Sequence, residues 1–231
     1  MEYNDFKWGA KLEDISRLGV IIHPSVADHP KTDFIEASLQ NERVTRERRD
    51  TGVWIKFEGN SDDRVPNNEI YLERKRAHYD DMDRTYFRRR PSGIKEGHLI
   101  FMAVVSYDPH GIGTPMIVGY AETEGFKSEN EIGTDNNFYK QTAGRYPYYV
   151  KLHSGRFLQA PMKYGVSLID LCRDLGVELY PALKKHPSEI LSTHHQKSHI
   201  QITEIAKDYL INKLEEKFRK HGAVIEGTFA E

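Results

Sequence analysis

The amino-acid sequence predicts an α+β fold, in which a twisted mixed sheet curls into a pseudo-barrel and is flanked by helices. Strand-like segments gather in the middle of the chain, and the most apolar of them spans residues 98–107. Helical patterns lie toward the two ends, and the longest spans residues 203–222. Strands and helices that occupy separate parts of a chain are typical of the α+β class.

Alternating apolar and polar residues predict the first two strands. In residues 52–59, Val53 and Ile55 fall on one face of the strand and Lys56 falls on the other. Residues 69–76, EIYLERKR, alternate in the same way. We therefore expect a second strand there, with its charged side chains facing solvent.

The later strands are more apolar. Residues 98–107, HLIFMAVVSY, are apolar almost throughout, which indicates a strand buried on both faces. Residues 116–126 form its expected antiparallel partner, in which Gly119 indicates a bulge or a close approach of two backbones. Residues 146–158 are the last long strand, and residues 199–203 form a short one.

Capping residues and apolar stripes predict the helices. Ser167 is the expected N-cap of a short helix that ends at Gly176. A further short helix is expected over residues 5–19. The helix over residues 203–222 carries an apolar stripe in which every fourth residue faces the core, namely Ala206, Leu210, Leu214 and Phe218.

The length of the chain suits one large domain or two small ones, and a single domain over residues 1–231 is expected. The formal net charge is −2, and no apolar run is long enough for a membrane span, so no membrane partner is expected. A single cysteine excludes an internal disulfide framework and a thiolate zinc cluster, and a cytoplasmic location is therefore expected. Arginine-rich stretches at residues 43–49 and 74–90 still allow a local basic face on this near-neutral chain.

One segment also fits a metal-dependent nuclease. Asp63 lies upstream of an acid-x-lysine motif, in which Glu73 is the acid and Lys75 the lysine. In such a site the carboxylates would hold a divalent ion and the lysine would orient water. Glu73 and Lys75 share a face if the segment is a strand. Both residue types also favour exposed strand faces. One function to weigh for this chain is thus a nuclease with these three catalytic residues. The simpler interpretation of the segment is a polar strand face exposed to solvent.

Other reactive residues favour structural roles. His195 and His199 have the spacing of a metal-binding pair on a helix, but they fall beside a predicted strand, so no metal is expected. Cys172 lies on the apolar side of its helix and is expected to be buried. No glycine-rich nucleotide-binding motif occurs, and no cofactor is expected.

Aromatic and basic residues interleave along the predicted strands. They alternate most densely from Arg145 to Lys151, in the run RYPYYVK. Aromatic faces can stack on an exposed base, while Arg and Lys side chains contact phosphates. A single aromatic residue more often belongs to a core. The hypothesis of nucleic-acid binding therefore rests on the combination of aromatic and basic residues. It favours a non-catalytic nucleic-acid-binding module that holds a nucleobase.

Three segments, in their order along the chain, resemble the core of PUA-like domains, nearest the EVE type. They are IKEGHLIFMAVV (94–105), VGYA (118–121) and YPYYVK (146–151). The sequence departs from the Gly-Asp that is usual in that family, because Gly97 is followed by His98.

This resemblance covers residues 94–220 and implies a small pseudo-barrel with a pocket for a nucleobase, often a modified base flipped out of its strand. Residues 1–93 would then add strands and helices with a charged insertion. The resemblance implies a DNA or RNA partner, and a partner nuclease or motor protein would supply any catalysis. By strand position, the base-binding residues would be Trp54, Tyr120 and Tyr148, and the phosphate-binding residues would be Arg145, Lys151 and Lys197.

Overall fold

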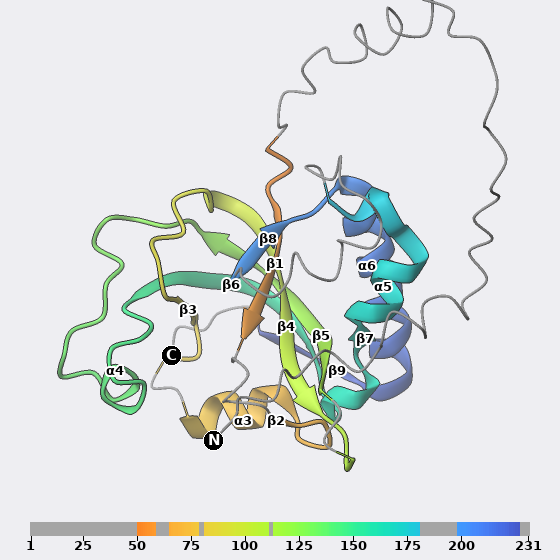
Figure 1. Cartoon of the computed structure of the whole chain (residues 1–231), viewed down its shortest axis with the longest axis horizontal. Helices are drawn as coiled ribbons and strands as arrows, with labels where there is room; N and C mark the ends of the chain where they lie inside the picture. Colours follow the sequence, from red (N-terminus) through yellow and green to blue (C-terminus); the bar gives the residue numbers. More distant parts are fainter. Residues whose placement is uncertain (1–49, 59–64, 79–80, 111–112, 181–197, 227–231) are drawn as a thin grey trace, which may run out of the picture. The chain divides into compact units, whose positions relative to one another are not determined.

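A curled mixed sheet is the framework of the fold (Figure 1). The computed structural model describes residues 50–58, 65–78, 81–110, 113–180 and 198–226. Within these ranges the sheet has nine strands: β1 (Val53–Glu58), β2 (Val65–Pro66), β3 (Arg84–Phe87), β4 (Glu96–Tyr107), β5 (Gly113–Glu124), β6 (Tyr148–Leu158), β7 (Val166–Ser167), β8 (His199–Gln201) and β9 (Ala223–Glu226).

The order of the strands makes the sheet mixed. It runs β3-β6-β5-β4-β1-β8, while β2 pairs with β4, β7 with β5 and β9 with β6. β1 and β4 are parallel, and β4, β5 and β6 pair antiparallel in succession. The predicted α+β class, with a curled mixed sheet flanked by helices, is therefore confirmed.

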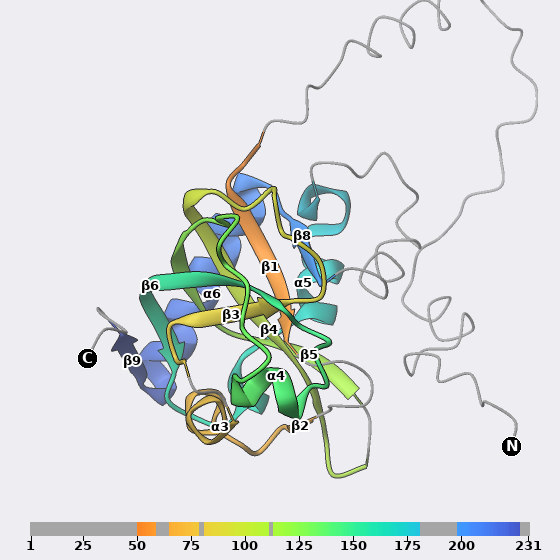
Figure 2. The same ribbon diagram turned by 90° about the vertical axis from the view of Figure 1, so that its left-hand side faces the viewer.

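Helices cover both faces of this sheet (Figures 1 and 2). α5 and α6 pack on one face around Ile55 and Phe101, while α3 and η1 pack on the other face around Ile100 and Met102. Within the described ranges, no helix combines the length and the apolar character that crossing a membrane requires. The helical elements are α3 (Tyr71–His78), α4 (Asn137–Gln141), α5 (Leu168–Leu175), α6 (Glu204–His221) and the 3-10 turns η1 (Met162–Tyr164) and η2 (Gly176–Leu179).

The central strand β4 is buried on both faces, as its apolar sequence predicts. Ile100, Phe101, Met102 and Ala103 have exposed fractions of 0%. Successive side chains point to opposite faces of a strand, so these four residues supply both core clusters in turn. β4 therefore joins the two halves of the core.

Gly119 of β5 has the role that its position predicts. The pairing of β4 with β5 shifts register between Met102 and Ala103, opposite Gly119. A Cβ atom on Gly119 would lie 2.5 Å from the carbonyl oxygen of Arg156 and 2.9 Å from the Cα of Phe157. The bulge and the close approach of the β6 backbone are therefore both confirmed.

The predicted helix boundaries are confirmed for α5 and α6. Ser167 accepts a hydrogen bond from the amide of Asp170, and Gly176 ends α5 with a φ of +50°. Thr203 caps α6 by accepting a hydrogen bond from the amide of Ala206. The predicted stripe of α6 is its buried face, formed by Ala206, Leu210, Leu214 and Phe218.

The strand predicted over residues 69–76 is wrong, because Tyr71–His78 is helix α3. Its buried side chains are Tyr71, Leu72 and Lys75, which have the spacing of one helix face. A short run with two inward apolar residues fits either periodicity, and tertiary packing decides between them. Strands β3 and β9 were not predicted, and the helix expected over residues 5–19 lies outside the described residues.

Replacement of Gly119 by alanine should destabilise the fold by about 2 kcal/mol, because the added methyl group overlaps the β6 backbone. Urea denaturation measures this change in the free energy of unfolding. Gly93→Ala is the control, since its Cβ would meet only the edge of the Trp54 ring, at 3.3 Å. Equal losses in the free energy of unfolding for the two substitutions would show that the close backbone contact at Gly119 does not require a glycine.

Candidate ligand pocket

The inward face of β1 carries charged side chains into the fold. Lys56 and Glu58 lie on the same face of the strand and have exposed fractions of only 3% and 8%. The alternation predicted for residues 52–59 is present, but the polar face is not solvated. Strand β3 and helix α3, neither of which was predicted, cover it.

Lys56 has an unusual environment for an amine. Its Nζ donates a hydrogen bond to the carbonyl oxygen of Phe57 at 2.7 Å and lies 5.0 Å from the centre of the Phe87 ring. Burial lowers the pKa of Lys56 to about 8, and although Glu58 opposes this decrease, the charge of Lys75 reinforces it. A pKa of about 8 leaves roughly a tenth of the amine neutral at pH 7.

Glu58 is held by hydroxyl groups from two other elements. Its Oε2 accepts a hydrogen bond from the hydroxyl of Tyr71 on α3 at 2.6 Å. Its Oε1 accepts one from the hydroxyl of Thr85 on β3 at 3.1 Å. These two bonds satisfy part of the hydrogen-bonding capacity of the buried carboxylate and fix its orientation beside Lys56.

A cavity of about 190 Å³ opens onto these two residues, and we name it the Lys56 pocket. In Figure 2, α3 and α4 lie next to each other at one end of the sheet, and both contribute to the lining. The aromatic lining residues are Tyr86, Phe138 and Tyr146, and the basic ones besides Lys56 are Arg74, His78 and Arg145.

The aromatic wall is a small cluster of its own. The rings of Tyr86 and Phe138 stack with centroids 4.2 Å apart, and Phe138 and Tyr146 lie 6.2 Å apart. Phe138 comes from α4, whose N-cap Asn136 accepts a hydrogen bond from the amide of Tyr139. The sequence indicates only a polar connection over residues 127–144. The local pattern that could have indicated the aromatic wall is an apolar residue, Phe138, two positions after the helix cap Asn136.

Arginine and tyrosine side chains pair beside the pocket, along β3, β6 and the residues that flank them. The guanidinium carbons of Arg84, Arg88 and Arg90 lie 4.3, 5.3 and 5.5 Å from the ring centres of Tyr149, Tyr146 and Tyr148, respectively. We call these six residues the Arg–Tyr surface. Ion pairs with Asp81 and Glu131 neutralise part of its charge.

The three aromatic residues predicted to bind a base do not come together. Trp54 is half-buried and donates from Nε1 to Nδ1 of His98 at 3.0 Å. Tyr120 faces α6, where its hydroxyl donates to Glu215 at 3.3 Å. Tyr148 belongs to the Arg–Tyr surface. None of the three lines the Lys56 pocket.

The predicted phosphate-binding residues are also spread over the structure. Arg145 lines the Lys56 pocket. Lys151 lies on β6, paired in register with Arg84, so it is next to the Arg–Tyr surface. Lys197 lies outside the described residues.

The geometry that the nuclease hypothesis requires is absent from Glu73 and Lys75. Residues two apart on a helix point about 200° away from each other, and here Glu73 is exposed while Lys75 is buried. Asp63 lies outside the described residues. In the part of the chain that the structure describes, no group of three His, Cys, Asp or Glu side chains could hold a metal ion.

His199 and Cys172, the other reactive residues considered from the sequence, pack within the fold. His199 of β8 packs against the Trp54 ring, with centroids 5.4 Å apart, whereas His195 is outside the described residues. Cys172 is buried as predicted, and burial raises the pKa of its thiol to about 12. A thiol with that pKa is a poor nucleophile.

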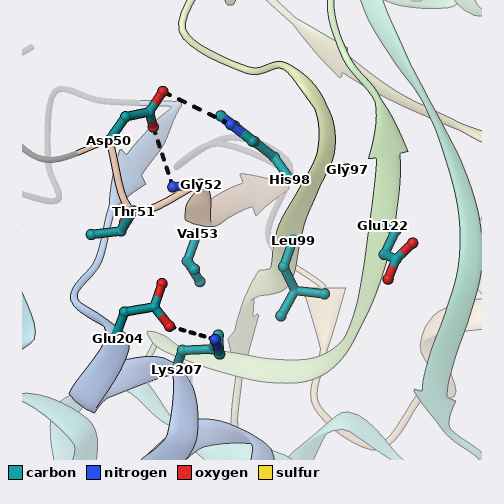
Figure 3. A pocket seen from close by; sticks show the side chains of 10 residues that line it. All are labelled: Asp50, Thr51, Gly52, Val53, Gly97, His98, Leu99, Glu122, Glu204 and Lys207. Atoms are coloured by element: carbon teal, nitrogen blue, oxygen red, sulfur yellow. Dashed lines mark hydrogen bonds and ion pairs between the residues drawn. The ribbon is translucent and has the colours of Figure 1, made fainter.

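A second hollow, of about 450 Å³, has a different charge (Figure 3). Three carboxylates line it, from Asp50, Glu122 and Glu204, together with His98 and Lys207. Figure 3 shows Glu204 and Lys207 paired with each other and Asp50 directed toward His98. This acidic lining disfavours an anionic ligand, whereas the basic lining of the Lys56 pocket suits one.

No family model and no curated protein sequence matches the chain.

The burial of Lys56 predicts a specific pH dependence of stability. Between pH 8 and 10.5 the unfolded state holds more protons at this residue than the folded state, so the free energy of unfolding rises with pH. The decrease in pKa from 10.5 to about 8 corresponds to roughly 3 kcal/mol. Lys56→Met should be more stable than the unsubstituted protein at pH 7, and this advantage should shrink by that amount by pH 10.5.

Urea denaturation at a series of pH values measures this difference. A stability difference between Lys56→Met and the unsubstituted protein that stays constant from pH 7 to 10.5 would contradict a charge buried at Lys56.

Proposed function

We propose that the chain is a non-catalytic nucleic-acid-binding module of the PUA-like kind, which holds a nucleobase in the Lys56 pocket. The observation that carries this proposal is the pairing of one buried donor, Lys56, with one buried acceptor, Glu58, at a cavity with aromatic walls. The base would be flipped out of a duplex or taken from a single strand.

The chemistry of the pocket fits the edge of a nucleobase. Bases present hydrogen-bond acceptors beside N–H donors on their Watson–Crick edges, and proteins that extrude a base read this edge directly. The amine of Lys56 can donate to an acceptor, and the carboxylate of Glu58 can accept from a donor. The rings of Phe138 and Tyr146 supply the apolar faces on which a base stacks.

The surroundings of the pocket fit a phosphate backbone. Arg74 and Arg145 line it, and the Arg–Tyr surface lies beside it on β3 and β6. The formal net charge of the chain is −2, so binding would depend on this local cluster of cations rather than on the whole surface. A partner nuclease or motor protein would supply any catalysis.

Fluorescence anisotropy with labelled DNA and RNA oligonucleotides, with and without modified bases, tests the proposal. Affinity should fall as salt rises, because phosphate contacts release counterions. Removing one stacking ring with Tyr146→Ala should weaken binding about tenfold. Tyr164→Ala is the control, since Tyr164 is exposed and does not line the pocket. If no oligonucleotide binds at low salt, the proposal is wrong.

A nuclease assay separates the two functions considered for this chain. With magnesium or manganese present, the unsubstituted protein should leave single- and double-stranded DNA and RNA intact, because Glu73 and Lys75 lie on different faces of α3. Cleavage by the unsubstituted protein that is lost in Glu73→Ala would instead assign the nuclease function.

A further inference from the structure

Lys56 combines burial with access to a cavity. It is only 3% exposed, and it lies against the Phe87 ring, yet it lines the Lys56 pocket. In the described part of the chain, its Nζ makes one hydrogen bond, to the carbonyl oxygen of Phe57. The remaining N–H positions and, in the neutral form, the lone pair are therefore available to a ligand.

These surroundings are those of a nucleophilic amine. A lysine in a poorly solvated site, near a second cation, becomes a nucleophile toward carbonyl compounds because its neutral form is populated. Lys75, which is 1% exposed, supplies the neighbouring charge and favours the neutral form of Lys56. Structural lysines buried for stability alone do not need an opening, and this one has a cavity beside it.

We propose that Lys56 captures planar aldehydes in this pocket by forming an imine. The Nζ lone pair of the neutral amine attacks the carbonyl carbon, and one of the two amine protons is transferred to the carbonyl oxygen to give a carbinolamine. The second amine proton is then transferred to the hydroxyl group, which leaves as water while the nitrogen forms the C=N bond. An amine and an aldehyde thus give an imine and one molecule of water, with no change in oxidation state.

Glu58 is the group placed to move the proton. It lies two residues from Lys56 on the same face of β1, lines the same cavity and acts electrostatically on the amine. The hydroxyls of Tyr71 and Thr85 hold its carboxylate in place. As a carboxylate, Glu58 can accept a proton that the attacking nitrogen loses and pass it to the oxygen of the carbinolamine, which must be protonated before it leaves as water.

The walls of the pocket define the class of aldehyde. Tyr86, Phe138 and Tyr146 favour a flat ring over an aliphatic chain. The pocket also favours a ring that carries a negative charge, through Arg145 and through Arg74, although the Arg74 guanidinium is already paired with Glu69 at 3.1 Å. An aromatic ring with a formyl group is therefore the expected ligand, and a formyl-bearing nucleobase belongs to that class. The inference goes beyond the proposed function and does not require it.

Reductive trapping of the full chain tests the proposal. The protein is incubated with benzaldehyde or with acetaldehyde in the presence of sodium cyanoborohydride, and the modified lysines are mapped and timed by peptide mass spectrometry. At pH 7.5, Lys56 should react with benzaldehyde at least about tenfold faster than the exposed residues Lys140 and Lys163, because burial lowers the pKa of Lys56 to about 8 and the pocket holds the ring beside its amine. Its preference for benzaldehyde over acetaldehyde should fall in Phe138→Ala.

Because the lysines are compared within one molecule, the result does not depend on whether a Lys56 variant folds. Lys56→Arg, which keeps the charge and cannot form an imine, should lose the fast-reacting site. The proposal is overturned if Lys56 stays unmodified while Lys140 and Lys163 react, or if it reacts no faster than they do. Oligonucleotide binding requires no covalent bond, so a failure here leaves the anisotropy result to decide the proposed function independently.

Discussion

The constraint on which the rest of the structure depends is that the sheet is covered on both faces. Helices α5 and α6 occupy one side, and α3, η1 and the strand β3 occupy the other. At Lys56 and Glu58 neither face of β1 is open to solvent, so these polar side chains need hydrogen-bond partners inside the protein. The hydroxyl groups of Tyr71 on α3 and Thr85 on β3 donate these hydrogen bonds to Glu58. The Lys56 pocket lies beside them.

Much of the scaffold can be predicted from the sequence because its signals are local. The apolar run of β4, the glycine in β5 and the capped helix α5 each report on a few neighbouring residues. The prediction failed for α3, where eight mostly polar residues carry too weak a periodicity to separate helix from strand. Strand β3 was not predicted because its four residues lie among arginines and charged turns.

The site is harder to predict because its properties are non-local. Nothing in the alternation around Lys56 indicates burial, which is imposed by segments distant in the chain. The sequence does indicate that aromatic and basic residues meet, and the Arg–Tyr surface agrees with that indication. The base-binding residues expected from strand position do not line the Lys56 pocket, because Trp54 and Tyr120 have other partners, and its lining residues Phe138 and Tyr86 carry no distinctive local pattern.

One wall of the pocket has an origin different from the rest. Phe138 and Tyr146 belong to the segment between β5 and β6, which pairs with the sheet at the bridge of Glu131 with Tyr148 and contributes to a separate cluster around Tyr86. Lys56 and Glu58, in contrast, are part of the central strands. Substitutions of Phe138 or Tyr146 therefore change the cavity at a cluster separate from the two main core clusters. The shape of this cavity can thus change in descendants of this chain while the buried amine and carboxylate stay in place on the central sheet.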